Sequence, residues 1–446
     1  MINLYYDTLL ENDIPVPNGV TNWEVTKGIT RVPYASNSNS IVEQYTFFFN
    51  ALKALGCNFQ LFSGKETAKN LFYPLEITHN ALSNDIANYI PTKTFSRIKK
   101  GKMKLLLVMP KVSHDYRYLW RLRKSIDCLE GYGMPREQIY VVLGDLNKTY
   151  RTLLNTKNVY GIDWWQIYTQ IILLSRYGMQ DYRWVFNDRN SYPPGDEKIK
   201  KETFDLDNWN PKRLFHAFTG RAKLHNTCFV TDLKYHELDK FGKYSYNIEY
   251  ADIQHNYKDF RITDKSKGEL FIERKKELVK NVTSKSVIMD MSLEQIKKGN
   301  QYYMHKSFYE DSLVNIVSDS WMPMMDAHYY EEVNVLAPGK MVWMQIAKGH
   351  PFMVLGCLNT IGYITDQGYF SSNWLVDESY SRVSSTTKVS EMICKNLKVL
   401  SEYSEQEIKD KVEELKPFLK RNKEKFFSRP NKRKFIILFE EMQYER

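Results

Sequence analysis

Alternating runs of apolar and polar residues mark out strands and helices in the first half of the chain. The apolar run Met103–Pro110 is typical of a strand that is covered on both faces. Apolar positions then recur at helical spacing over Asp115–Glu130, and Gly131 ends this predicted helix. A second buried strand is predicted at Ile139–Leu143. Strand, helix and strand at this spacing predict a βαβ unit of a parallel sheet.

Other segments of the first half extend this pattern. Helical spacing predicts helices over Ile41–Leu55 and Tyr160–Tyr177, and Cys57–Phe62 is predicted to be a short buried strand. From Asp188 to Pro211 the chain is rich in Asn, Asp, Pro and Gly, and its periodicity is lost. We interpret this stretch as the connection between two domains.

The second half repeats the alternation of strands and helices. The predicted strands are Arg213–Thr219, Leu313–Ser318 and Pro351–Gly356. The predicted helices are Leu224–Leu238, Leu293–Gln301 and Gly339–Ala347. Beyond Ser401 the chain becomes helical, and Ser404 with Glu407 forms a capping-box pattern, in which a hydroxyl and a carboxylate satisfy N–H groups at a helix start.

This alternation predicts an α/β protein with two domains. A chain of 446 residues exceeds the usual size of one hydrophobic core, so two domains of about 200 residues each are expected. We place an N-terminal Rossmann-like domain at residues 1–205, a second Rossmann-like domain at 206–400, and a basic helical segment at 401–446.

Composition and charge add the kind of partner to this picture. A hydrophobic content of 43% and an aromatic content of 14% indicate a folded protein rather than a disordered or fibrous one. The formal net charge of +10 favours a polyanionic partner such as nucleic acid, a phosphorylated sugar or an anionic membrane surface, with solvated Lys faces as the alternative. Its most basic stretch is Lys416–Lys434, where nine positive residues accompany a single negative one, Glu424.

Cysteine usage and hydropathy indicate a cytoplasmic protein. The five cysteines are scattered and never form a CxxC pair, which fits buried thiols better than disulfides or a zinc site. The N-terminus lacks a basic region followed by an apolar core, so no secretory signal is expected. No apolar run approaches the length of a membrane span, so no membrane partner is expected either.

Several familiar catalytic signatures are missing from the sequence. It has no Walker A loop, no GxGxxG after a strand, no HExxH and no GxSxG, which removes the usual support for ATPases, dinucleotide enzymes, zincins and serine hydrolases. Asp205–Asp207 is a DxD, a carboxylate pair that can hold a divalent metal. Because three-residue patterns arise easily by chance and this one follows no strand, we interpret it as a coincidence.

Four ordered clusters in the second half resemble a known family. They are Pro211–Leu214 with Gly220–His225, Val317–Ser320, Gly339–Lys340 with Gly349–Met353, and Asp377–Ser381. In this order and spacing they are similar to the donor domain of a GT-B-type glycosyltransferase family that is common in bacteriophage and marine-virus genomes. That family is itself distantly similar to fucosyltransferases. The resemblance covers about residues 205–400.

The resemblance implies two Rossmann-like domains facing each other across a cleft, with the C-terminal helices returning to the first domain. It implies a nucleotide-sugar donor on the second domain, held without a required metal. Cationic groups at strand-to-helix turns suit the diphosphate, and carboxylates suit ribose or sugar hydroxyls. The donor-binding residues expected on this basis are Arg221, Lys223, Asp319, Lys340, His350, Glu378 and Tyr380.

Some of these positions have a second interpretation. Lys340 and His350 also fit an ordinary surface residue and the start of a buried strand. Where the family has a Glu before the retained Lys, this chain has Gly339. That change implies another carboxylate, such as Glu331 or Glu332, or a different donor, or lost activity.

Catalysis by inversion requires a base on the acceptor domain. The loop after the first clear strand offers His114 and Asp115, although Asp115 equally suits a cap of the next helix. The viral resemblance and the positive charge imply a DNA acceptor with a hydroxymethylated or already glycosylated base, in a host cytoplasm. Base extrusion and phosphate contacts then follow. The phosphate contacts expected are Lys99, Lys100, Lys102, Lys420 and Arg421.

Two alternative functions stay open. The first is a glycosyltransferase that acts on a glycan or a protein. The second is a nucleic-acid-binding or virion-associated protein that has a GT-B-like fold without turnover, as the Gly339 change suggests.

Overall fold

A computed structural model of the chain forms two compact units, Met1–Pro194 with Arg429–Arg446, and Gly195–Ser428. The residues that the structure describes are 2–6, 42–43, 59–63, 70–77, 86–109, 116–144, 149–163, 165–167, 169–170, 204–221, 224–247, 273, 307–318, 338–356, 358–383, 385–428 and 436–442.

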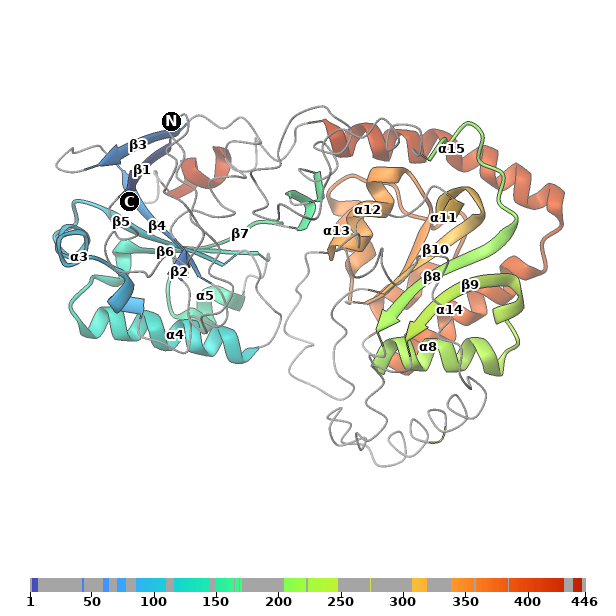
Figure 1. The fold of residues 1–446 in the computed structure, drawn as a ribbon, viewed down its shortest axis with the longest axis horizontal. Helices are drawn as coiled ribbons and strands as arrows, with labels where there is room; N and C mark the ends of the chain where they lie inside the picture. The colour runs from blue at the N-terminus through green and yellow to red at the C-terminus, as the bar shows by residue number, and fades with distance from the viewer. Residues whose placement is uncertain are drawn as a thin grey trace, which may run out of the picture. The chain divides into compact units, whose positions relative to one another are not determined.

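The first unit is built on a seven-stranded, mostly parallel sheet (Figure 1). Its strand order is β3-β1-β4-β5-β6-β7, and β2 pairs with β4 in the antiparallel direction. The strands are β1 (Ile2–Tyr6), β2 (Val42–Glu43), β3 (Phe59–Ser63), β4 (Leu71–Ile77), β5 (Lys104–Met109), β6 (Ile139–Leu143) and β7 (Val159–Gly161). The described helices are η2 (Ile86–Tyr89), α3 (Thr92–Lys99), α4 (Tyr116–Gly131), η3 (Arg136–Gln138) and α5 (Thr149–Leu154).

The predicted βαβ unit is confirmed as β5, α4 and β6. Residues 105–109 and 139–143 are buried throughout, because both faces of a parallel sheet are covered. The helix turns Leu119, Leu122 and Ile126 toward the core at helical spacing. A continuous apolar run and a 3.6-residue period therefore predicted these three elements correctly.

Two predicted helices begin as strands instead. Val42 lies opposite Ile77 in β2, and residues 159–161 form β7 beside β6. The ring of Tyr160 stacks on that of Tyr140 at a centroid distance of 6.3 Å. Pairing with a neighbouring strand outweighs helical spacing here, because tertiary contacts override local propensity. Most of the predicted helix 41–55 lies outside the described residues, and helical geometry follows β7 from residue 165.

The second unit contains a four-stranded parallel sheet with the order β11-β10-β8-β9. The strands are β8 (Arg213–Arg221), β9 (Gly242–Asn247), β10 (Ser312–Ser318) and β11 (Phe352–Leu355). The described helices are α8 (Leu224–Tyr235), η5 (Asp239–Phe241), α11 (Ser307–Glu310), α12 (Lys340–Lys348), α13 (Thr360–Asp366), η10 (Glu378–Arg382), α14 (Thr386–Ser401) and α15 (Glu405–Phe427). The predicted α/β class, with two parallel-strand sheets, is confirmed. The predicted helix 293–301 lies outside the described residues.

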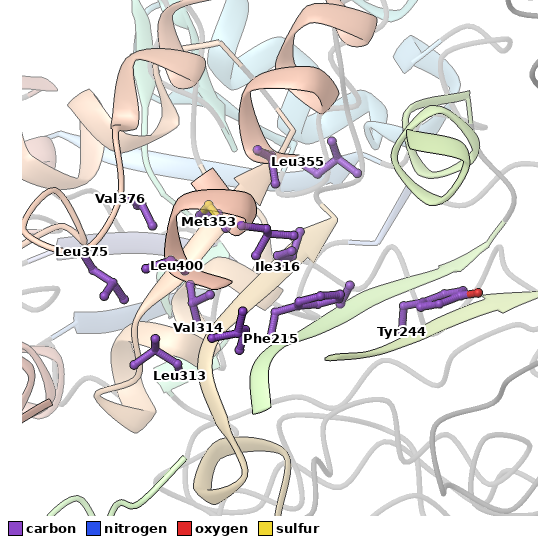
Figure 2. Close-up of a cluster of buried hydrophobic side chains, with 14 of the residues drawn as sticks. Phe215, Tyr244, Leu313, Val314, Ile316, Met353, Leu355, Leu375, Val376 and Leu400 are labelled. Carbon is purple, nitrogen blue, oxygen red and sulfur yellow. The ribbon is translucent and has the colours of Figure 1, made fainter. Parts of the chain in front are cut away.

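Helices cover both faces of the second sheet. Helices α8 and α14 pack together on one face, and α12 and α15 pack together on the other (Figure 1). Between these layers, Figure 2 shows the apolar core, to which Phe215 contributes from β8, Val314 and Ile316 from β10, and Met353 from β11. Residues 204–211, which we interpreted as an interdomain connection, contribute Phe204, Leu206 and Trp209 to this same core.

The chain returns to the first unit at its C-terminal end. Helix α15 belongs to the second unit, whereas the helical residues 436–442 pack on the first. Phe439 makes an edge contact with Phe72 of β4 at a centroid distance of 5.7 Å. The Lys104 ammonium donates a hydrogen bond to the carbonyl of Met442 at 2.9 Å. A cation at a helix C-terminus is favourable because the last carbonyls carry partial negative charge.

None of the helices in these described ranges is long and apolar enough to cross a membrane.

Candidate functional site

The second sheet reverses its winding direction between β8 and β10. From β8 the chain passes through α8 to β9 on one side, and from β10 it passes to β11 on the other. Because crossovers between parallel strands are right-handed, opposite directions place α8 and α12 on opposite faces of the sheet. Their loops separate at the carboxyl ends of β8 and β10. In open α/β sheets this topological switch point is where ligands bind.

The ends of three elements come together at this switch point. Arg221 is the last residue of β8, and α8 begins only three residues later. His225, in the first turn of α8, has its Nε2 atom 3.0 Å from the hydroxyl oxygen of Ser318, the last residue of β10. His225 is only 5% exposed, so it ties the helix start to the strand end. The N-terminus of α8 thus follows the strand-end residue Arg221 closely in the chain, and a helix N-terminus is suited to an anion.

Buried polar contacts hold the start of α8 in place. The Thr227 hydroxyl lies 2.8 Å from the Tyr246 hydroxyl of β9. Burial raises the pKa of Tyr246, so its hydroxyl stays protonated at neutral pH. The Thr219 hydroxyl donates a hydrogen bond to the carbonyl of Ser245, which joins β8 to β9 near the same edge. The side chains beside the switch point are therefore polar, and hydrogen bonds hold them in place.

The loop that follows β11 also lies at the carboxyl ends of the strands. Asn359 adopts a left-handed backbone conformation with φ of 59°, and its N–H donates to the Ser381 carbonyl at 2.6 Å. A Cβ atom added to Gly362 would lie 2.2 Å from the Asn359 side-chain oxygen, so the glycine leaves room for this side chain against the start of α13. The contact brings the exposed Arg382, which follows Ser381, to the carboxyl end of β11.

Lys340 lies at the end of α12 that is directed toward the same edge of the sheet. It is the first residue of α12, and the C-terminal end of α12 leads into the amino end of β11. The helix N-terminus is therefore directed toward the carboxyl ends of the strands. Gly339, which stands where the family has Glu, is the N-cap of α12 and makes no side-chain capping bond. Lys223 and Asp319, by contrast, lie outside the described residues, and for Arg221 and Lys340 only the backbone is described.

Glu378 and Tyr380 take part in hydrogen bonds at the edge of the second sheet. Strand β11 is the last in its sheet, so alternate N–H groups point away from β10. The Val354 N–H donates to the Tyr380 hydroxyl at 3.1 Å, and the Phe352 N–H donates to the Ser372 hydroxyl at 3.1 Å. Glu378 in turn accepts a hydrogen bond of 2.7 Å from the Ser372 N–H. Glu378 and Tyr380, both predicted to bind the donor, thus accept hydrogen bonds from backbone N–H groups of the protein itself.

The pKa shifts in this loop follow from burial. Burial raises the pKa of the Glu378 carboxyl against the lowering effect of hydrogen bonds from Ser371 and Ser372. Burial, together with the nearby Glu378 charge, raises the pKa of the fully buried Tyr380 hydroxyl well above its ordinary range. Tyr380 is fully buried, whereas Glu378 is partly exposed.

His350 lies at the opposite end of the sheet. It precedes β11 and is 1% exposed, with its ring against those of Phe204, Trp209 and Tyr309. Its Nε2 atom lies 3.0 Å from the carbonyl oxygens of both Tyr309 and Ser312. Burial lowers its pKa to about 4, so the imidazole is neutral at pH 7. The structure does not bring His350 together with Arg221, and we leave it outside the candidate site.

The predicted phosphate contacts also lie at amino ends. Lys99, Lys100 and Lys102 are exposed and directly precede β5. Lys420 and Arg421 are exposed on α15. The residue before them, Leu419, lies close to Gly349, because a Cβ atom added to Gly349 would be 2.9 Å from the Leu419 carbonyl oxygen. Gly349 precedes β11, so this part of α15 lies near the amino end of that strand. The predicted catalytic pair, His114 and Asp115, falls outside the described residues, between β5 and α4.

The DxD residues form a turn rather than a metal site. Asp205 accepts hydrogen bonds from the Asp207 N–H at 3.0 Å and from the Asn208 amide at 2.6 Å, and the second of these is the main cause of its lowered pKa. Within the described ranges no group of three or more His, Cys, Asp and Glu side chains could hold a metal ion.

Sequence reasoning missed His225 and Ser318 as site residues. Both stand inside clusters that carried the resemblance, but neither has a charge that marks it for a diphosphate. The available signal was their position, since one follows and the other ends a predicted strand. Comparisons of the chain with protein-family models and with curated proteins find no match.

Proposed function

We propose that this protein is a nucleotide-sugar-dependent glycosyltransferase of GT-B-like architecture. The observation that carries the proposal is the switch point of the second sheet, where Arg221 and the first turn of α8 stand together. A nucleoside diphosphate carries concentrated negative charge, which a helix start and a cation neutralise together. The resemblance over residues 205–400 supplies the sugar-transfer chemistry.

The proposed reaction is displacement at the anomeric carbon of the donor sugar. An acceptor hydroxyl forms the new bond to this carbon, the bond from carbon to the diphosphate oxygen breaks, and the hydroxyl proton passes to a base. Arg221, Lys223 and Lys340 stabilise the leaving diphosphate, so no metal is required. We assign the base to His114 or Asp115, since the segment that contains them follows the carboxyl end of β5.

We propose that the acceptor is DNA with a hydroxymethylated or already glycosylated base, and that the protein is encoded by a phage. The net charge of +10 supports a polyanionic acceptor over a neutral glycan or a protein. Binding to duplex DNA that weakens steeply with salt is the expected signature. A failure to bind DNA even at low salt favours the glycan or protein acceptor.

A second candidate function is a nucleic-acid-binding or virion-associated protein without turnover. Two observations favour it: Gly339 replaces the family Glu, and His350, Glu378 and Tyr380 all have structural partners. The absence of donor binding together with salt-dependent DNA binding is the result that this function predicts.

The test is thermal stabilisation by UDP-, GDP- and CMP-linked sugars. A donor that binds the native state at about 100 times its Kd contributes about 2.7 kcal/mol, which raises the Tm by about 5 °C or more. We expect Arg221→Gln to abolish the shift. The matched control is Arg213→Gln, because Arg213 is exposed at the other end of the same strand.

Two results count against this proposal. One is the absence of stabilisation and of diphosphate release with every donor tried. The other is an equal loss of stabilisation in Arg221→Gln and Arg213→Gln, because that would place donor binding elsewhere.

A further inference from the structure

The outer face of α4 in the first unit exposes a tryptophan among cations. Trp120 is 48% exposed, whereas Leu119 and Leu122 beside it are buried. Arg121 and Lys124 are also exposed, and at helical spacing they share the solvent side with Trp120. A half-exposed tryptophan is unusual, because this large apolar side chain is highly buried on average.

The charges on α4 are segregated along its length. Residues 116–126 include four Arg or Lys and no acidic residue. The acidic residues Asp127 and Glu130 follow in the second half, and both form ion pairs with Arg136, whose side chain is only 17% exposed. Asp127 also lies 3.9 Å from Arg123, at the boundary between the two halves. The negative charges are therefore matched locally, and the N-terminal half of the helix carries a net positive face.

This face lies at the ligand-binding end of the first sheet. Helix α4 follows β5, and the start of a helix after a parallel strand lies at the strand's carboxyl end. Trp120 is in the second turn of α4 and so is close to that end. Lys99, Lys100 and Lys102 lie at the opposite end of the same strand.

The Trp120 ring and the Lys124 side chain form a cation–π pair. The ammonium of Lys124 lies 4.1 Å from the centroid of the Trp120 ring. An aromatic ring beside cationic side chains is an arrangement that binds single-stranded nucleic acid, with the base on the ring and the phosphates on the cations.

We propose that the α4 face, defined as Trp120, Arg121, Arg123 and Lys124, binds a single-stranded stretch of DNA and stacks one unpaired base on Trp120. The proposal rests on the proposed function for the identity of the nucleic acid. It adds where the acceptor strand lies on the first unit. An acceptor base taken out of its duplex leaves an unpaired strand that needs such a surface.

The test is fluorescence anisotropy of a labelled DNA strand of about 20 nucleotides, with the full-length protein and no sugar donor. We expect Trp120→Ala to weaken binding to this strand about tenfold and binding to the matching duplex much less. Trp120→Phe, which keeps a ring, should restore most of the affinity. Trp374→Ala is the matched control, since Trp374 is 52% exposed in the second unit.

Charge removal gives a second readout that does not depend on the ring. Arg121→Gln with Lys124→Gln should reduce the slope of log affinity against log salt by about 1.4, because each contact to a single strand contributes about 0.7. The control pair, Lys93→Gln with Lys157→Gln, removes the same charge from exposed positions elsewhere on the first unit and should change the affinity less than the first pair.

The proposal is overturned if Trp120→Ala binds the single strand like the unmodified protein, if Trp374→Ala loses as much, or if strand and duplex are weakened equally. Thermal stabilisation by sugar nucleotides in the same variants separates this proposal from the proposed function. Retained donor binding with unchanged DNA affinity in Trp120→Ala rejects only the α4 face. Lost donor binding in the unmodified protein with Trp120-dependent DNA binding rejects only the glycosyltransferase.

Discussion

His350 illustrates how a residue that suits a ligand also suits a core. Both ring nitrogens face backbone carbonyls, of Pro351 on one side and of Tyr309 and Ser312 on the other. A neighbouring network joins the Ser312 hydroxyl to Asn315, and the Asn315 amide donates to Gln345. These contacts link the amino ends of β10 and β11 to α12, so His350 has a structural role at this end of the sheet.

Burial of His350 makes the second unit sensitive to acid. Its pKa is lowered to about 4 in the folded protein, whereas an unfolded histidine has a pKa of about 6.5. Between these values the unfolded chain binds more protons, so the free energy of unfolding falls as the pH drops from 6.5 toward 4. The loss is about 3 kcal/mol. We expect His350→Asn, which does not titrate, to lack this component.

The measurement is urea-dependent oxidation of the buried Met353 in the second unit at a series of pH values. His236→Asn is the control, because His236 is exposed in the same unit. The comparison of variants is required, since the raised pKa of Glu378 contributes a slope of opposite sign. Identical pH profiles for His350→Asn and the unmodified protein would contradict the prediction.

The same residues show what a single sequence can predict about a site. Residue type indicated which side chains could serve an anion, but it could not tell the two ends of a parallel strand apart in function. Arg221 and His350 fitted one pattern, yet one ends its strand and the other precedes its strand. The structural role of Tyr380 depends on β11 being an edge strand, which is a property of the sheet order and not of the local sequence.

At the scale of elements, local signals were reliable where they were complete. Strands β5, β6 and β10 are buried along almost their whole length, and β5 and β6 appear in the sequence as apolar runs, whereas Asn315 interrupts that of β10. Strands β2 and β7 have only two and three residues, too few to show the period of a strand, so their sequences alone favoured helices. The capping box of α15 was also predicted correctly, because it is formed within four consecutive residues.

That capping box should stabilise the start of α15 measurably. The Ser404 N–H donates to the Glu407 carboxylate at 2.8 Å, and the Glu407 N–H donates to the Ser404 hydroxyl at 3.3 Å. Ser404→Ala removes one of these two bonds and should cost about 1 kcal/mol. Ser385→Ala at the start of α14 is the matched comparison, and it should cost less, since its bond from the Lys388 N–H is 3.5 Å long.

Hydrogen exchange of the first-turn amides of each helix measures both effects in the intact protein. Faster exchange in α15 for Ser404→Ala, with a smaller change in α14 for Ser385→Ala, is the expected pattern. An equal or larger effect in α14 would show that the hydrogen-bond lengths do not rank these two caps.

At the scale of the whole molecule, the chain leaves the first unit and comes back to complete it. Residues 436–442 are more than 270 residues away from β7 in sequence, yet they pack against β4 and β5. The Lys104 ammonium lies 4.6 Å from the Tyr140 ring centroid and also donates to the Met442 carbonyl. The stability of the first unit therefore depends on the last residues of the chain.

Phe439→Ala should weaken the first unit and spare the second. Phe439 is 1% exposed, and removal of a buried phenylalanine side chain costs about 3–5 kcal/mol. The control is Ile437→Ala on the same helical turn, because Ile437 is 42% exposed and a surface change costs about 0.5 kcal/mol or less. Urea-dependent oxidation of the buried Met109 reports on the first unit, and that of Met353 reports on the second.

We expect Phe439→Ala to move the Met109 transition to lower urea while the Met353 transition stays within error, and Ile437→Ala to move neither. Parallel shifts of both methionines in Phe439→Ala would mean that the two units unfold together, which would contradict their independence. An unchanged Met109 transition would mean instead that the C-terminal helical residues do not stabilise the first sheet. The two reporters belong to different sheets, so each outcome assigns the energetic effect of Phe439 to one unit or to both.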